Sequence, residues 1–168
     1  MAKLSDKMVT ELNAQLGREL SAANQYLAMA IYLDARSLKE LSSFFYQQSD
    51  EERQHAMKFL HYLLNANATP VVPAVPEPVA DFESIEQIAE MGLNQEQEVT
   101  RCIHELVDLA LSEKDHTTNH FLQWFVEEQL EEEATFGELL DVIRQSENLL
   151  LVEQYVFRQK PGAANGGE

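Results

Sequence analysis

The sequence predicts an all-α fold: a four-helix bundle with one long crossover connection and a short fifth helix at the C-terminus. Most of the chain is rich in Ala, Leu, Glu and Gln, which favour helix. Four of the five prolines fall in one run, where helix is excluded: Pro70, Pro73, Pro76 and Pro78. Four long segments carry apolar residues at alternating three- and four-residue steps, which is typical of helices that pack in a bundle.

In order along the chain, the expected helices span about residues 5–35, 38–66, 81–112, 114–145 and 147–159, with an extended connection over 69–80. Ser5 or Asp6 is the expected cap of the first helix and Asp81 that of the third. Short joins make the first two helices antiparallel, and likewise the third and fourth. The connection can reach roughly 40 Å, the length of the bundle, so the second and third helices should run parallel.

Composition narrows the possible partners and the location. With 168 residues, the chain fits one domain, expected over 1–160 with a disordered tail at 161–168. A net charge of −17 argues against nucleic acid or an anionic membrane as partner and suits a protein that handles cations. A lone cysteine, Cys102, excludes a Cys-based zinc or iron–sulfur site within one chain. Neither a membrane span nor a secretory signal is evident, so we expect a cytoplasmic protein.

A carboxylate interrupts each of the four apolar stripes near its middle. The fourth stripe is expected to comprise Phe121, Phe125, Glu128, Glu132, Thr135, Leu139 and Val142, and the four interruptions are Glu19, Glu52, Glu96 and Glu132. Four inward carboxylates repel one another unless they are protonated or neutralised. Since the stripes carry neither Lys nor Arg, a pair of metal ions is the simplest solution. Glu52 and His55 form Glu-x-x-His, an element of di-iron and di-manganese bundles.

Each of these residues also has a simpler interpretation. In a chain with 29 acids, a single helical Glu is more often a solvated surface residue. The prediction of a metal site therefore depends on the coincidence of four interruptions at matching heights along the bundle. Tyr26, two turns after Glu19, is either a core tyrosine whose hydroxyl a carboxylate satisfies or a redox-active neighbour of the metals. Gln129, three residues before Glu132, is either a ligand or a neighbour of one.

Four segments give the chain a resemblance to a known family. They are Gly17–Leu20 with Tyr26, Asp50–Ala56, Gln95–Thr100 and Phe121–Glu133. Together they make the chain similar, over essentially its whole length, to non-haem ferritins of the bacterial or archaeal type. The resemblance implies a ferroxidase centre in which Glu52 bridges two irons. One iron would be held by Glu19, Glu52 and His55, and the other by Glu52, Glu96 and Glu132, with Gln129 and Tyr26 nearby.

The same resemblance implies an activity and an assembly. Such proteins oxidise Fe(II) to Fe(III) with dioxygen or peroxide and store the ferric mineral in a hollow shell of twenty-four subunits, a homo-oligomeric 24-mer. The fifth helix matches the one that lines the four-fold axes of the shell. A third iron is expected on the cavity side, at Glu51, Glu128 and Glu131. Haem is not expected, because Arg53 stands where haem-binding relatives carry a methionine.

Two other readings of the same pattern remain open. A di-iron oxidase or peroxidase of the rubrerythrin kind would use the same bundle without storing iron. An acidic structural bundle would bind a protein partner and no metal, although the inward carboxylates argue against it. The measured mass of the assembly separates these readings.

Overall fold

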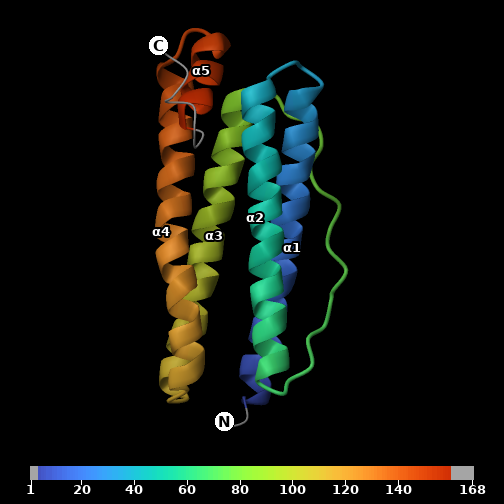
Figure 1. Cartoon of the computed structure of the whole chain (residues 1–168), viewed down its shortest axis with the longest axis vertical. Helices are drawn as coiled ribbons and strands as arrows, with labels where there is room; N and C mark the ends of the chain where they lie inside the picture. The colour runs from blue at the N-terminus through green and yellow to red at the C-terminus, as the bar shows by residue number, and fades with distance from the viewer. Residues whose placement is uncertain (1–3, 160–168) are drawn as a thin grey trace, which may run out of the picture.

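The computed structural model describes residues 4–159, so the predicted tail at 161–168 lies outside the described residues. The helices are α1 (Asp6–Asp34), α2 (Lys39–Asn65), α3 (Ile85–Ser112), α4 (His116–Gln145) and α5 (Leu149–Gln159). Figure 1 shows α1 antiparallel to α2 and α3 antiparallel to α4, with the connection running along the bundle beside α1. Helices α2 and α3 therefore point the same way. The predicted all-α bundle with one crossover is confirmed, and within 4–159 none of the helices is long and apolar enough to cross a membrane.

The start of α3 differs from the prediction. Asp81 was the expected cap, whereas the helix begins at Ile85 and the hydroxyl of Ser84 accepts a hydrogen bond from the backbone N–H of Gln87 at 3.0 Å. The cause lies on α1, because the Tyr32 hydroxyl donates to the carbonyl of Phe82 at 2.7 Å. The buried Phe82 ring also meets Tyr32 edge-on. These contacts tie residue 82 to α1 outside any helix, and α3 starts after it.

One face of α1 holds the crossover connection in place. Asn13 accepts a hydrogen bond from the backbone N–H of Val71 at 2.6 Å. Three turns further on, the amide of Gln25 both accepts from and donates to the backbone of Val79, each at 2.9 Å. Between them, Gly17 leaves room for Pro73, since an added Cβ would lie 2.7 Å from the proline Cγ. Spacings of four and eight residues put these groups on one face of the helix.

The apolar core is divided into two clusters. One lies toward the α3–α4 turn and includes Leu12, Leu16, Phe59, Ile103 and Phe125. The other lies toward α5 and includes Met29, Phe45, Ile88, Phe136 and Val156. On each long helix, the residues between the two clusters include a buried glutamate. The bundle therefore carries a polar layer across its middle.

The predicted buried face of α4 is partly wrong. Glu128 and Thr135 border a hollow between α2 and α4 instead of entering the core. The buried positions of α4 are Thr118, Leu122, Phe125, Gln129, Glu132, Phe136, Leu139 and Leu140. In the middle of α4, the buried positions are therefore displaced by one residue from the predicted ones: Gln129 and Phe136 are buried in place of Glu128 and Thr135. Phe136, absent from the predicted stripe, stacks on Tyr26 with ring centroids 5.3 Å apart.

Helix α5 closes one end of the bundle, beside the start of α2 (Figure 1). Val152 and Val156 are buried against the bundle. The carboxylate of Glu153 accepts hydrogen bonds from the backbone N–H groups of Glu40 at 3.0 Å and Leu41 at 2.9 Å. It thereby satisfies two donors at the start of α2, where the N-cap residue provides no side-chain hydrogen bond. The rest of α5 exposes large apolar side chains, those of Leu149, Leu150, Leu151 and Phe157.

Two helical glycines provide a matched test of this packing. At Gly92, an added Cβ would lie 2.4 Å from a ring carbon of Phe136, whereas at Gly137 nothing lies within 4 Å. We expect Gly92→Ala to destabilise the protein by about 1–3 kcal/mol through overpacking. Gly137→Ala should stabilise it by about 0.5–1 kcal/mol, because alanine favours helix. Thermal unfolding of both variants beside the parent checks this, and equal shifts of the two would contradict the packing described.

Candidate metal centre

Each long helix contributes one carboxylate to the polar layer. The exposed fractions of Glu19, Glu52, Glu96 and Glu132 are 1%, 1%, 0% and 5%, and that of His55 is 3%. The four interruptions predicted from the sequence are therefore all interior. Burial of ionised carboxylates is costly unless each is paired, protonated or bound to a cation. Within the described residues, none of the Lys or Arg ion pairs involves these four acids.

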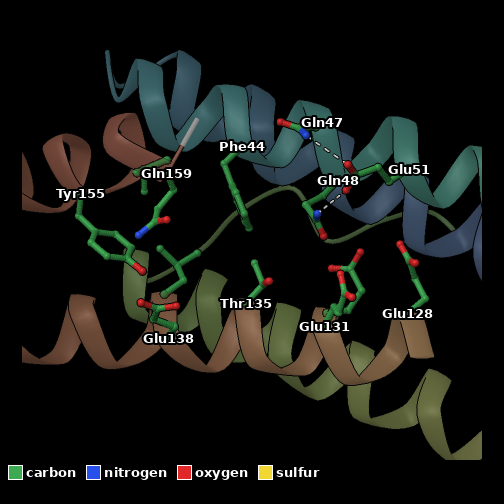
Figure 2. Close-up of a pocket in the computed structure, with 13 residues that line it drawn as sticks. Phe44, Gln47, Gln48, Glu51, Glu128, Glu131, Thr135, Glu138, Tyr155 and Gln159 are labelled. Atoms are coloured by element: carbon green, nitrogen blue, oxygen red, sulfur yellow. Dashed lines mark hydrogen bonds between the residues drawn. The ribbon is translucent and has the colours of Figure 1, made fainter. Parts of the chain in front are cut away.

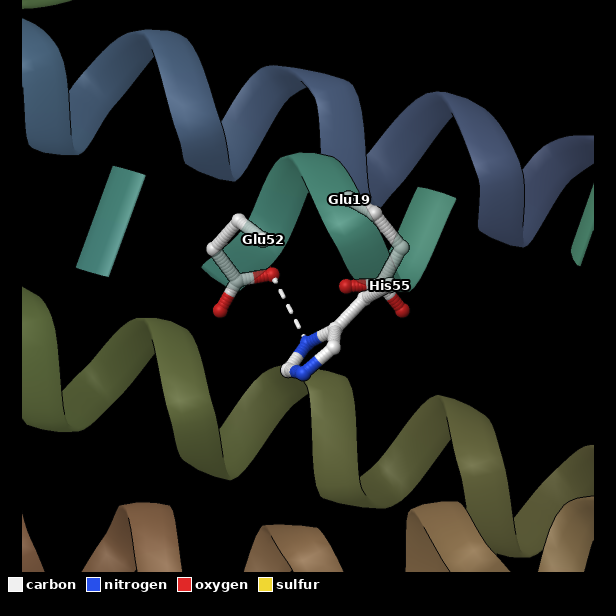
Figure 3. A group of neighbouring side chains, drawn as sticks. All are labelled: Glu19, Glu52 and His55. Carbon is white, nitrogen blue, oxygen red and sulfur yellow. Dashed lines mark ion pairs between the residues drawn. The ribbon is translucent and has the colours of Figure 1, made fainter. Parts of the chain in front are cut away.

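Glu19, Glu52 and His55 form the tightest part of the layer (Figure 3). Each offers one ligand atom, and these atoms lie within 4.8 Å of one another. The Nδ1 atom of His55 is 3.5 Å from Oε2 of Glu52. Oε2 of Glu19 and Oε2 of Glu52 are buried and accept no hydrogen bond. Two buried carboxylate oxygens that accept no hydrogen bond, together with an imidazole, form a donor set suited to a hard divalent cation.

Glu96 differs from these two carboxylates because both of its oxygens are occupied. The Tyr26 hydroxyl donates to one oxygen, and the side-chain amide of Gln129 donates to the other at 3.0 Å. Tyr26 therefore contacts a carboxylate on α3, which satisfies its hydroxyl. Gln129 is itself buried and also donates to the backbone carbonyl of Glu96 at 3.2 Å. Both residues thus lie at the predicted site and act on the same carboxylate.

The electrostatics of the layer favour either protons or a bound cation. Burial and the neighbouring Glu52 raise the pKa of Glu19 well above its ordinary value, and burial and Glu96 do the same for the pKa of Glu52. Burial also raises the pKa of Glu96. Burial and the charge of Glu96 raise the pKa of Glu132 to about 8. A bound divalent cation would offset both the penalty of burial and the mutual repulsion, and it would take the place of the protons.

The three residues of the predicted third site face one hollow, which α2 and α4 line together with α5 (Figure 2). The hollow has a volume of about 400 Å³, and Glu51, Glu128 and Glu131 line it together with Glu132. The amides of Gln47 and Gln48 donate to the two oxygens of Glu51, at 3.2 and 2.7 Å. Oε1 of Glu128 is 3.7 Å from Nε2 of His55. The hollow thus adjoins the buried layer.

Sequence analysis missed one buried amide at the site. Gln15 is fully buried and donates to Glu19. Gln48, four residues before Glu52 on the face of α2 expected to be buried, is also buried, and its side-chain carbonyl accepts no hydrogen bond. Gln15 precedes Glu19 by four residues, which puts both on one face of α1, so its spacing could have been noticed. Trp124 meets the ring of His55 edge-on with centroids 5.4 Å apart.

Comparison with known proteins gives consistent matches. A family model described as a ferritin-like domain matches residues 9–146. The bacterial non-heme ferritin of Staphylococcus aureus strain MRSA252 is 43% identical over 133 residues, covering 79% of this chain and 80% of that protein. That of Staphylococcus saprophyticus is 39% identical over 140 residues, covering 83% and 84%. An open pore ferritin from the archaeon Archaeoglobus fulgidus superposes with a TM-score of 0.91 at 37% identity, covering 95% of this chain and 100% of that one.

The raised pKa of Glu132 leads to a prediction for the metal-free protein. Between the ordinary value of 4.5 and the folded-state value of about 8, the folded protein binds more protons than the unfolded one, so stability should fall as pH rises through this range. We expect the melting temperature of Glu132→Gln to fall less than that of the parent protein between about pH 5.5 and about pH 8.5, because the variant lacks this carboxyl group. Glu127→Gln, which removes an exposed acid from the same helix, is the control. Identical pH profiles for the two variants would contradict the assignment.

Proposed function

The chain belongs to the ferritin family, and we propose that it oxidises Fe(II) to Fe(III) at the buried layer and stores the ferric product in a hollow homo-oligomeric cage. One observation carries the proposal. Glu19 and Glu52 each present a buried oxygen that accepts no hydrogen bond beside His55, in a layer of four carboxylates that forms no ion pair with Lys or Arg within residues 4–159. Such a layer attracts cations, and iron is the cation that the names of the family's members imply.

The ligands divide between two iron positions. Glu19, Glu52 and His55 would hold one iron, and Glu52, Glu96 and Glu132 the other, with Glu52 as the bridge and Gln129 beside the second. Hard anionic oxygens favour Fe(III) over Fe(II), because they neutralise the extra charge. Two Fe(II) ions give up two electrons, which with two protons reduce dioxygen to hydrogen peroxide, or peroxide to water. Pairing the irons therefore matches the electron count of the oxidant.

Tyr26 is proposed to take part in this chemistry through Glu96. Its hydroxyl donates to that carboxylate and lies 3.4 Å from the carbonyl of Gly92. Burial and the charge of Glu96 raise the pKa of Tyr26 well above its ordinary value, so the hydroxyl keeps its proton while Glu96 is charged. A redox-active tyrosine at this place would be a neighbour of the second iron.

Assembly into a cage is proposed from the exposed face of α5. The exposed fractions of Leu149, Leu150, Leu151 and Phe157 are 43%, 66%, 54% and 50%, which is high for large apolar side chains on one short helix. Burial against symmetry mates would remove this surface from water and close a shell. We propose a cytoplasmic 24-mer without haem, in which residues 1–160 form a single domain.

Iron oxidation tests the centre directly. After anaerobic loading with Fe(II) and exposure to air, the parent protein should form the ferric product much faster than iron in buffer. Glu52→Ala combined with His55→Ala removes the bridge and the nitrogen ligand, so we expect the rate to fall nearly to that of buffer. The matched control is Glu127→Ala combined with His61→Ala, which removes an exposed acid and an exposed histidine.

The same samples report on storage. The parent protein should elute with a mass about twenty-four times 19.1 kDa and should retain iron. Unimpaired oxidation by the folded Glu52→Ala, His55→Ala variant would refute the centre. A small oligomer that oxidises iron and retains none would instead favour the rubrerythrin-like alternative.

We further propose that Glu51, Glu128 and Glu131 hold a third iron on the way out of the layer. They share the hollow beside His55 and Glu132, so an ion there could pass to or from the centre. The amides that hold Glu51 are neutral, and its negative charge therefore remains available to a cation.

A crystal soaked in Fe(II) tests the third position. Three metal peaks per subunit are expected, the third about 2.0–2.6 Å from oxygens of these carboxylates. Glu51→Ala combined with Glu131→Ala should remove only the third peak and alter the ratio of iron oxidised to oxygen consumed. Full occupancy of two positions with the third empty would rule the site out.

A further inference from the structure

Gln15 is a buried amide that links the metal centre to the outer part of α1. Its exposed fraction is 0%, and its Nε2 donates to Oε1 of Glu19 at 2.8 Å. Its own carbonyl oxygen accepts a hydrogen bond from Nη1 of Arg18 at 3.0 Å. All three side chains come from little more than one turn of the same helix, so the contact does not depend on how the helices pack against one another.

Arg18 fixes the orientation of this amide. A guanidinium group only donates hydrogen bonds, so the amide must present its oxygen to Arg18. The amide NH₂ then has to face Glu19. With a neutral or absent neighbour at position 18, the amide could rotate by half a turn and place its oxygen against the carboxylate, which would repel it. The guanidinium therefore determines which end of Gln15 meets Glu19.

The hydrogen bond also determines which oxygen of Glu19 is free. Oε1 is occupied by Gln15, whereas Oε2 is buried and has no partner. The carboxylate thus has one anchored oxygen and one oxygen left for a cation. Glu96, by contrast, has hydrogen bonds to both oxygens. Donors outside a metal site commonly set the orientation of its ligands in this way.

We propose that Gln15, oriented by Arg18, is a positioning residue that holds Glu19 so that Oε2 is presented to the first metal ion. The inference rests on the proposed function of the layer as an iron site. A purely structural role, in which Gln15 only satisfies a buried carboxylate, predicts a change in stability without a specific change in metal binding.

Anaerobic titration with Co(II) separates these roles, because bound Co(II) reports its ligand geometry through its visible absorption. Gln15→Met keeps an unbranched side chain of similar length and removes the donor. We expect it to weaken binding of the first ion roughly ten-fold or more and to change the Co(II) spectrum. Gln25→Leu on the same helix removes an amide that contacts the connection, and it should bind Co(II) as the parent does.

Two further comparisons make the test specific. Arg18→Met should weaken binding in the same direction, and Arg18→Lys, which keeps a cationic donor, should restore it. In a Glu19→Ala background, Gln15→Met should have no further effect, since a residue that acts through Glu19 has nothing left to position. Additive effects of the two substitutions would overturn the proposal.

The outcomes also distinguish this inference from the proposed function. Failure of the parent protein to bind Co(II), or unchanged binding in Glu52→Ala, would refute the metal centre itself. A different result would refute only the role of Gln15. In that case the parent protein binds Co(II), Glu52→Ala abolishes the binding, and Gln15→Met leaves both the affinity and the spectrum unchanged. If Gln15→Met does not fold, the comparison of Arg18→Met with Arg18→Lys provides the same test at a half-buried position.

Discussion

The rest of the structure depends on one constraint: four carboxylates lie in a single buried layer with no Lys or Arg paired to them among the described residues. Like charges so close together in a low-dielectric interior raise one another's pKa values, and only protons or cations relieve the repulsion. The surrounding donors are neutral, from Gln15, Tyr26 and Gln129. They orient the carboxylates and leave their negative charge unbalanced. The layer divides the apolar core into two clusters, each of which packs as an ordinary bundle on one side of it.

Helix periodicity predicted the bundle and the inward carboxylates, and the lengths of the connections predicted the topology, but periodicity did not fix the phase of α4. Acids stand at residues 127, 128 and 131–133, so polarity alone could not show which of them faces inward. The spacing of Phe125, Gln129, Glu132 and Phe136 indicates the correct buried face, because a large apolar residue flanks Gln129 and Glu132 on each side. Gly92 opposite Phe136 was a further signal, since a ring so close to a helix needs a residue without a side chain.

The exact partner of a side chain on another helix was beyond sequence reasoning, because it depends on side-chain direction across the bundle. Tyr26 follows Glu19 on α1, yet its hydroxyl meets Glu96, 70 residues away. Tyr32 on the same helix delays the start of α3 by binding the carbonyl of Phe82. Contacts within one helix are different. Gln15 and Glu19 are four residues apart, so their pairing follows from geometry that any helix provides, and it was open to prediction.

The two halves of the layer are prepared differently for a cation. The α1–α2 hairpin supplies Glu19, Glu52 and His55, and one oxygen of each carboxylate accepts no hydrogen bond. The α3–α4 hairpin supplies Glu96 and Glu132, and both oxygens of Glu96 already accept hydrogen bonds. A cation on the first half meets free ligands, while one on the second half must share or displace the donors Tyr26 and Gln129. The hydrogen bonds within the layer therefore make its two halves unequal, and the inequality follows from which hairpin carries each carboxylate.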